Sequence, residues 1–412
     1  MILKNKFERK DIRALMKTID FSYLVAPLTI QEFFKDNWEK AFVHNRHENP
    51  GYFDNLVSIA DIDDFLSQQN LVPEGIKVMN KGNSIPPANW TRSDTLIDGT
   101  IKTVVDPGKL IGHFNEGATI IINSADRSIS RLSKACRALE QELKFRLQSN
   151  IYITPPNSQG FAMHYDPHDI FLMQIKGPKT WMIYDTGEDL PVKYRAFSHK
   201  PRLVSKFEIN SGDFLYIPRG TTHEAMSSGV STIHVNFSLK PVYGYHMVEE
   251  LARIAYEKER FFRLTIPNGF QSENEQNAYL AAFKEKLNEL IEKISPEQLL
   301  EKQGDHFVKE QAIDFRGKLT DSLRIEDLNG DTQVSRRTGF TCLFKTEDGK
   351  FNIYFGGQKL TIPPFIEKDI FLQFGPFTAK QIKGLATPGG KLQLVQKLIE
   401  AGYLKIDDPK HE

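Results

Sequence analysis

Strand-like patterns dominate the middle of the chain. ATIIINSAD, residues 118–126, is a continuous apolar run between polar residues, which is typical of a buried strand. STIHVNFSL, residues 231–239, alternates polar and apolar positions, so its polar residues share one face that we expect to look into a barrel. Those polar residues are His234, Asn236 and Ser238. Residues 160–184 and 212–224 are two further strand-rich stretches.

Helical periodicity comes before and between these strands. Residues 28–46 carry aromatic side chains at near-helical spacing after Thr29, which predicts a helix with Thr29 as its N-cap. A second helix is expected after residue 126, where four residues form one apolar stripe that packs as core. The stripe consists of Leu132, Cys136, Leu139 and Leu143.

After Leu239 the pattern changes from strand to helix. Residues 246–264 and 277–294 follow a period of 3.6, and the second stretch has an apolar seam flanked by Lys and Glu. Such a seam needs covering, and periodicity alone leaves intramolecular packing and dimerisation both open. The seam consists of Leu280, Phe283, Leu287, Leu290, Ile291 and Ile294.

The last part of the chain predicts a third unit. Residues 339–362 form three strand-like runs separated by Asp348-Gly349 and Gly356-Gly357, two strong hairpin signals. We expect one helix to begin at Pro363-Pro364 and another to span residues 391–404. At 412 residues the chain exceeds the size of one core, and we place the domains at 1–240, 241–325 and 326–412.

Composition narrows the class of protein. A hydrophobic content of 40% suits a folded globular chain, and 53 basic residues balance 53 acidic ones, so no global field attracts nucleic acid. Two cysteines, Cys136 and Cys342, argue against a disulfide scaffold and for a reducing cytoplasm. The amino terminus lacks the apolar segment of a signal peptide, and no apolar run is long enough for a membrane span.

A candidate metal site lies on two of the strand-rich stretches. His164 and Asp166 are two positions apart, so on a strand both side chains project to one face while Tyr165 points away. His223 follows a turn built from Pro218, Arg219 and Gly220. Two histidines and one carboxylate are the set that leaves half of an octahedral iron(II) open for other ligands.

Two other histidines lie close in sequence to this set. His168 follows Pro167, which argues for a break in the strand, so we interpret it as a residue at the rim of the site. His234 is expected to be a core histidine with satisfied hydrogen bonds rather than a fourth ligand. The segment from Gly212 to His223 also resembles the second motif of the cupin barrels, with Asp166 where many cupins carry a second histidine in the first motif.

The stretch NIYITPPNSQGFAMHYDPHDIFLMQIKGPKTW resembles the metal-binding core of the JmjC-type 2-oxoglutarate oxygenases, most closely the ribosomal oxygenase branch. The shared pattern is an asparagine and a tyrosine before the strand, then His-x-Asp, then a basic residue. This resemblance implies an α+β chain with a double-stranded β-helix (cupin/JmjC jelly-roll) barrel. A helical dimerisation region and a C-terminal winged-helix domain are then expected to follow the barrel.

The basic residue of that pattern is Lys179. If the metal is iron(II), an oxoacid that chelates it needs its far carboxylate neutralised, and a buried lysine supplies charge and hydrogen bonds. Lys179 alternates with Trp181 and Ile183, which favours an inward side chain over one that snorkels to solvent. By the same resemblance Asn150, Tyr152 and Ser238 are expected to contact the cosubstrate or its surroundings, although Tyr152 could equally be a strand aromatic and Asn150 a helix cap.

The sequence therefore predicts an Fe(II)- and 2-oxoglutarate-dependent protein hydroxylase. The resemblance implies a homodimer that acts on an arginine or histidine side chain of a ribosomal protein. Lys179 stands where the arginine-hydroxylating bacterial members tend to carry arginine, which leaves the target side chain open. The alternatives are a hydroxylase that tailors another protein or a peptide natural-product precursor, and a non-catalytic metal-binding cupin; DNA binding and lysine demethylation are disfavoured.

Overall fold

The computed structural model describes residues 19–185, 188–195, 197, 200–269, 272–384 and 386–407. The chain divides into two compact units, whose described residues lie within 19–240 and 241–407. Within the described residues, no helix combines the length and the apolar character that crossing a bilayer requires. The expected boundary near residue 326 stays a prediction.

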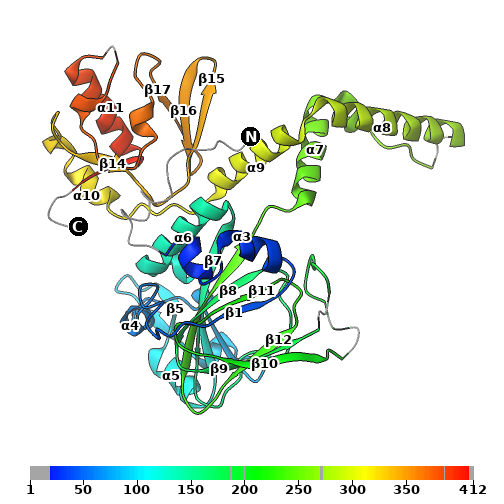
Figure 1. The fold of residues 1–412 in the computed structure, drawn as a ribbon, viewed down its shortest axis with the longest axis vertical. Helices are drawn as coiled ribbons and strands as arrows, with labels where there is room; N and C mark the ends of the chain where they lie inside the picture. The colour runs from blue at the N-terminus through cyan, green and yellow to red at the C-terminus, as the bar shows by residue number, and fades with distance from the viewer. Residues whose placement is uncertain are drawn as a thin grey trace. The chain divides into compact units, whose positions relative to one another are not determined.

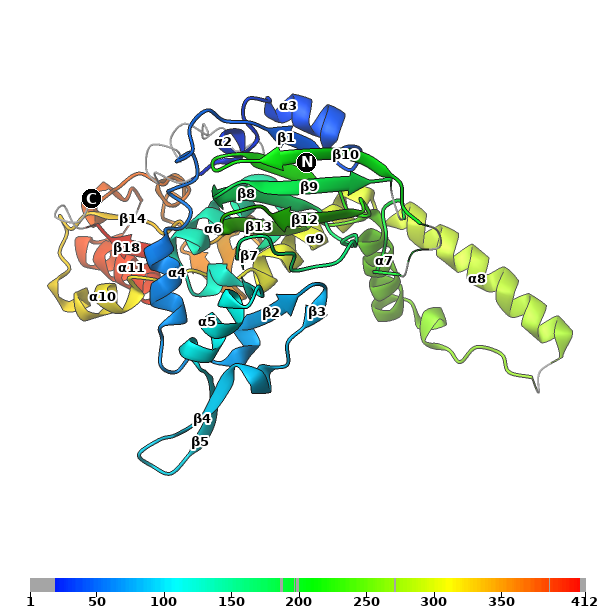
Figure 2. The same cartoon turned by 90° about the horizontal axis from the view of Figure 1, so that it is seen from below.

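The unit that ends at residue 240 is built on two antiparallel sheets (Figures 1 and 2). One apolar cluster contains Ile170 and Leu215 from the larger sheet and Trp181 and Ile209 from the smaller, so the two sheets face each other. The larger sheet has the strand order β1-β11-β8-β13-β7-β6-β2-β3 and the smaller the order β10-β9-β12. The strands are β1 Val43–Asn45, β2 Ile76–Asn80, β3 Asn83–Ser84, β6 Thr119–Ile122, β7 Arg146–Thr154, β8 Ile170–Lys176, β9 Lys179–Tyr184, β10 Leu203–Ile209, β11 Phe214–Ile217, β12 His223–Ser227 and β13 Thr232–Lys240.

Helices and a hairpin surround these sheets. The predicted stripe of α6 is confirmed, because Leu132, Cys136 and Leu139 are fully buried in the main core cluster. Each such apolar side chain contributes about 1.5–3 kcal/mol on burial. The elements are α2 Phe21–Val25, α3 Ile30–Glu32, α4 Ile59–Leu66, α5 Pro107–Asn115 and α6 Ser130–Leu143, with the hairpin β4 Thr91–Thr95 and β5 Ile101–Val105.

The helix expected over residues 28–46 is shorter than predicted. Thr29 does cap it, but the helix passes into a π-helical turn at Phe33–Asn37 and ends there. Residues Val43–Asn45 form β1 instead, and Val43 pairs with Tyr216 of β11. The sheet edge supplies backbone partners to this segment, so tertiary context overrides the helical spacing.

The unit that begins at residue 241 combines helices with a small three-stranded sheet. Both predicted hairpins are confirmed: positive φ angles at Asp348, Gly349, Gly356 and Gly357 fit the tight turns that join the strands. Figure 1 shows α8 projecting away from these strands. The elements are α7 Gly244–Lys258, α8 Glu273–Lys293, α9 Pro296–Glu310, α10 Lys318–Leu323, β14 Val334–Arg336, β15 Leu343–Glu347, β16 Lys350–Phe355, β17 Gln358–Ile362, α11 Pro388–Glu400 and β18 Leu404–Ile406.

The prediction of a helix that begins at Pro363-Pro364 is wrong. In the described residues between β17 and α11 the chain forms only short 3-10 turns, at Asp369–Phe371 and Ala379–Gln381. A β-bridge joins Ile366 to Gly384 and pins the two ends of this loop together. The helix predicted for residues 391–404 is present as α11, although it begins earlier and ends at Glu400.

These elements confirm the predicted α+β class and a cupin-like fold of mixed helix and sheet content. Much of the predicted seam of α8 faces solvent: Leu280 is 62% exposed, Phe283 40% and Ile291 54%, whereas Leu290 is buried. The dimerisation region and the winged helix stay predictions.

Candidate metal centre

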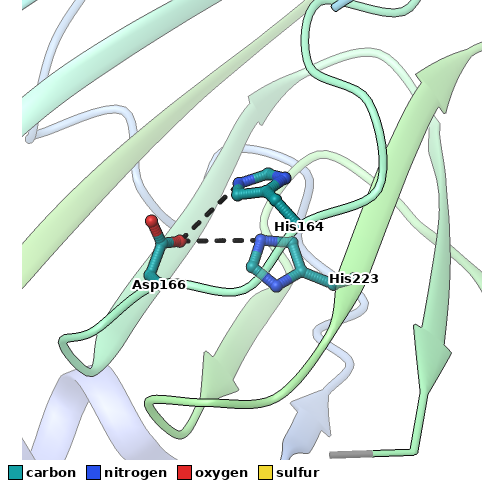
Figure 3. A group of neighbouring side chains, drawn as sticks. All are labelled: His164, Asp166 and His223. Carbon is teal, nitrogen blue, oxygen red and sulfur yellow. Dashed lines mark ion pairs between the residues drawn. The ribbon is translucent and has the colours of Figure 1, made fainter. Parts of the chain in front are cut away.

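Three predicted ligands meet at one point of the unit that ends at residue 240. The ligand atoms of His164, Asp166 and His223 all lie within 4.8 Å of one another (Figure 3). The Asp166 Oδ2 atom is 3.8 Å from His164 Nε2 and 3.7 Å from His223 Nε2. Two imidazole nitrogens and one carboxylate oxygen therefore converge on a space in which an ion could sit.

The backbone around His164 differs from the prediction. We expected residues 160–184 to form strand with a break at Pro167, but β8 begins only at Ile170, and His164 forms a single antiparallel bridge with His223. In that bridge each residue donates its backbone N–H to the other's carbonyl, at 3.0 and 2.7 Å. Pro167 lacks a ladder donor, which fits the short pairing. The predicted alternation still holds, since Tyr165 is buried and its hydroxyl donates to Glu188, on the side away from the ligands.

Backbone carbonyl groups orient both imidazole rings. His164 Nδ1 lies 2.8 Å from the carbonyl oxygen of Ala162, and His223 Nδ1 lies 2.9 Å from that of Thr221. A proton on each Nδ1 satisfies these contacts and leaves each Nε2 lone pair free for a metal. Burial, together with the neighbouring His164, lowers the pKa of His223 to about 4, so this ring is neutral at physiological pH.

The turn before His223 requires glycine at position 220. Gly220 has a φ of +82°, and a Cβ there would lie 2.1 Å from the carbonyl oxygen of Glu188. The N–H of Gly220 donates to the carbonyl oxygen of Asp166 at 2.9 Å. The turn of the second motif thus fixes the backbone of the carboxylate ligand as well as the approach to His223.

The three ligand residues line one end of a cavity of about 650 Å³, open mouth included. Both sheets contribute to its wall. The remaining lining residues are Thr119, Tyr152, Thr154, Gly160, Phe161, Lys179, Trp181, Ala225, His234 and Asn236.

Lys179 faces into this cavity, as its register predicts. Its side chain is only 5% exposed, so it does not snorkel to solvent. The Nζ atom lies 3.2 Å from Thr154 Oγ1 and 3.4 Å from His234 Nδ1. Burial lowers the pKa of Lys179 to about 7, because desolvation penalises the ammonium form.

The other predicted contacts divide into two groups. Tyr152 lines the cavity, and burial raises the pKa of its phenol. Asn150 and Ser238 are outside the lining: Asn150 Oδ1 accepts the N–H of Ser124 at 3.0 Å, and Ser238 Oγ bonds His168 Nε2 at 3.0 Å. Asn150 lies inside β7 and is not a helix cap. The hydrogen bond to Ser238 and the absence of His168 from the lining are consistent with a position beside the site.

Sequence reasoning missed several lining residues. Thr154 shares a strand face with Tyr152, so the two-residue period contained its signal, and Asn236 lies on the polar face that we expected to look inward. His234 was expected to be a core histidine, yet it both lies in the core and lines the cavity. Thr119 lies on β6, distant in sequence from the ligands, so only the fold brings it to the cavity, whereas Phe161 lies three residues before His164.

Comparisons with known proteins find similarity in sequence and in fold. Residues 125–247 match the family model of the JmjC domain. The bifunctional lysine-specific demethylase and histidyl-hydroxylase NO66 of Drosophila sechellia is 27% identical over 324 residues, which cover 72% of this chain and 46% of that protein. The protein of the same name from Drosophila erecta is 29% identical over 251 residues, covering 57% of this chain and 36% of that protein. The chain thus matches less than half the length of each of these relatives.

Solved structures share the fold. A structure of YcfD, a ribosomal oxygenase from Escherichia coli, in complex with cobalt and succinic acid has a TM-score of 0.56 and 16% identity, covering 93% of this chain and 99% of that one. A complex of the same protein with cobalt and 2-oxoglutarate has a TM-score of 0.55 and 15% identity, with the same coverage of both chains. Residues 125–247 are thus similar to the JmjC domain, and the resemblance predicted from the sequence is confirmed.

A metal-binding measurement tests the three ligands. We expect His223→Ala to weaken Mn(II) binding by more than about 100-fold, because one of three protein ligands is lost. His168→Ala is the matched control, since His168 lies nearby but bonds Ser238, and its Mn(II) affinity should equal that of the unaltered protein. Isothermal titration gives both constants, and equal affinities for all three proteins would contradict the assignment.

Proposed function

We propose that this protein is an Fe(II)- and 2-oxoglutarate-dependent hydroxylase that acts on a protein side chain. The observation that carries the proposal is that a set of candidate metal ligands and a buried lysine lie in one cavity. His164, Asp166 and His223 converge at one place in its wall, and the buried ammonium of Lys179 stands at another.

The donor set fits iron(II). Two neutral imidazoles and one carboxylate suit a divalent transition metal and leave open positions for a bidentate oxoacid and for dioxygen. Lys179 has no carboxylate partner among the described residues, so an anionic ligand would supply the missing counter-charge. In this proposal dioxygen is the oxidant, and bound iron(II) with 2-oxoglutarate would activate it: one oxygen atom would enter the oxoacid, which loses carbon dioxide to become succinate, and the other would convert the substrate C–H to C–OH.

The chain's own residues then have separate tasks. His164, Asp166 and His223 would hold the metal, and Lys179 would pair with the distal carboxylate of 2-oxoglutarate. The rings of Phe161 and Trp181 line the same cavity and would exclude bulk water from it. Asn150, Tyr152 and Ser238 are proposed to contact the cosubstrate or its surroundings, Tyr152 directly and the other two through neighbouring side chains.

We propose an arginine or histidine side chain of a ribosomal protein as the target. The support comes from the relatives, one named as a histidyl-hydroxylase and one described as a ribosomal oxygenase. Intact-mass comparison of ribosomal proteins from cells with and without this gene should reveal one protein heavier by a single oxygen atom. An Asp166→Ala version of the gene should leave that protein unmodified, because the carboxylate ligand is lost.

Two results would separate this proposal from its alternatives. If the protein releases succinate from 2-oxoglutarate but the masses of the ribosomal proteins are unchanged, the substrate would be another protein or a peptide precursor. Purified protein that binds iron(II) but releases no succinate with any peptide would make it a non-catalytic metal-binding cupin.

The affinity for 2-oxoglutarate should depend on pH. Lys179 in the free protein has a pKa near 7, and a bound dicarboxylate stabilises the ammonium and raises that pKa. Binding above pH 7 therefore takes up a proton, and the affinity falls by up to about tenfold per pH unit as the pH rises. Calorimetry from pH 6 to about pH 9 measures this slope. Lys179→Met should bind weakly with little pH dependence, and an equal slope in both proteins would contradict Lys179 as its origin.

We also propose that α7, α8 and α9 form a homodimer interface and that residues 326–412 form a winged-helix domain. The exposed apolar residues Leu280, Phe283 and Ile291 on α8 support the first proposal. The sheet β15-β16-β17 together with α11 supports the second.

Sedimentation equilibrium tests the dimer. Leu280→Asp places a charge in the exposed seam and should convert a dimer to a monomer, because the charge would lose its hydration in the interface. Ile97→Asp is the control, since Ile97 is fully exposed on the β4–β5 hairpin, outside the proposed interface. A monomeric unaltered protein would contradict the proposal directly.

A further inference from the structure

The hydrogen bonds of Lys179 show how its ammonium is held. A lysine ammonium has three N–H donors and no acceptor. Two of the neighbours at hydrogen-bonding distance are Thr154 Oγ1 at 3.2 Å and His234 Nδ1 at 3.4 Å. Both neighbours are uncharged groups, so the two contacts direct the ammonium without neutralising it.

His234 is fixed in place by its own packing. It is 3% exposed, and its ring stacks on that of Tyr152 with centroids 4.6 Å apart and planes at 5°. The Trp181 ring meets it edge-on at 6.0 Å. In the sheet His234 pairs with Tyr152 on one side and Gln174 on the other, so neither its backbone nor its ring is free to move away from Lys179.

The protonation state of His234 suits an acceptor. Burial lowers the pKa of this imidazole well below its usual value, and the nearby Lys179 adds a smaller effect in the same direction. The ring is therefore neutral. In a neutral ring only one nitrogen carries a proton, and the lysine contact selects the form with the proton on Nε2 and the lone pair on Nδ1. The ring therefore accepts from the ammonium and does not repel it.

Thr154 is fixed in a similar way. Thr154 and Thr119 are each about 1% exposed, and the Thr119 hydroxyl donates to Thr154 Oγ1 at 3.3 Å. The two threonines lie on β7 and β6, so a second pair of strands holds this acceptor. Lys179 is thus restrained by neutral groups from β7 and β13.

We propose that His234 is a positioning residue: its Nδ1, with Thr154 Oγ1, occupies two donors of Lys179 and leaves the third aimed at the distal carboxylate of the cosubstrate. This inference rests on the proposed function. A lysine side chain has a flexible four-carbon stem, and holding it beforehand reduces the entropy lost when the ligand binds. Neutral acceptors hold the ammonium without neutralising its charge, so that charge stays available to the cosubstrate carboxylate. An aspartate or glutamate at either position would neutralise it.

Two substitutions at position 234 separate hydrogen bonding from packing. His234→Phe keeps a ring that can stack on Tyr152 but removes the acceptor, and His234→Asn keeps an acceptor oxygen close to the place of Nδ1. N-oxalylglycine, an unreactive analogue of 2-oxoglutarate, is titrated into the Mn(II) protein. We expect His234→Phe to weaken its binding at least about tenfold, the effect of one hydrogen bond to a charged group, and His234→Asn to stay within about threefold.

Oxalate provides the control for a purely structural effect. Oxalate chelates the metal but has no distal carboxylate, so His234→Phe should leave its affinity unchanged. Equal losses for oxalate and N-oxalylglycine would mean that the substitution disturbs the whole cavity, and would overturn the inference. In turnover, the KM for 2-oxoglutarate should rise more than kcat falls.

The outcomes also distinguish this inference from the proposed function. If the unaltered Mn(II) protein does not bind N-oxalylglycine, the proposed function fails. If it binds and His234→Phe binds equally well, only the role of His234 fails. Should His234→Phe not fold, Thr154→Val removes the other acceptor with little change in volume, and undiminished binding by that variant would overturn the shared role of the two residues.

Discussion

The site depends on one backbone interaction, the bridge between His164 and His223. Two N–H groups and two carbonyl groups are paired there, and the pairing brings a loop before β8 into register with the start of β12. Each residue of the pair carries a proposed metal ligand, and the third proposed ligand, Asp166, follows Tyr165 in the same loop. A pairing in which each residue both donates to and accepts from the other fixes the two segments side by side. The distance between the two imidazoles is therefore set by the main chain.

The charges in the cavity are arranged around that bridge. Asp166 contributes the one carboxylate of the ligand set, while the residues that restrain Lys179 are neutral. An acidic group beside Lys179 would have satisfied the buried ammonium in the free protein and reduced its attraction for an anion. The cavity instead leaves Lys179 without an anionic partner among the described residues, and a dicarboxylate that chelates the metal would supply one.

Much of the ligand set could be predicted from sequence, for a specific physical reason. The two-residue spacing of His164 and Asp166, and the turn requirement at Gly220, are local constraints that remain visible in the chain. The strand expected around His164 was wrong because only a single pair of residues is bridged, which depends on where β12 lies. Thr119 reaches the cavity from a segment distant in sequence, and no local pattern marks it.

The Nδ1 atoms of both ligand histidines bond main-chain carbonyl oxygens, those of Ala162 and Thr221. Every amino acid carries such a carbonyl, so the side chains at these two positions can change without removing the groups that set the imidazole tautomers. Substitutions at Ala162 or Thr221 would therefore leave the tautomers of the two proposed nitrogen ligands unchanged. Variation among related chains can alter the rest of the cavity while the ligand field stays constant.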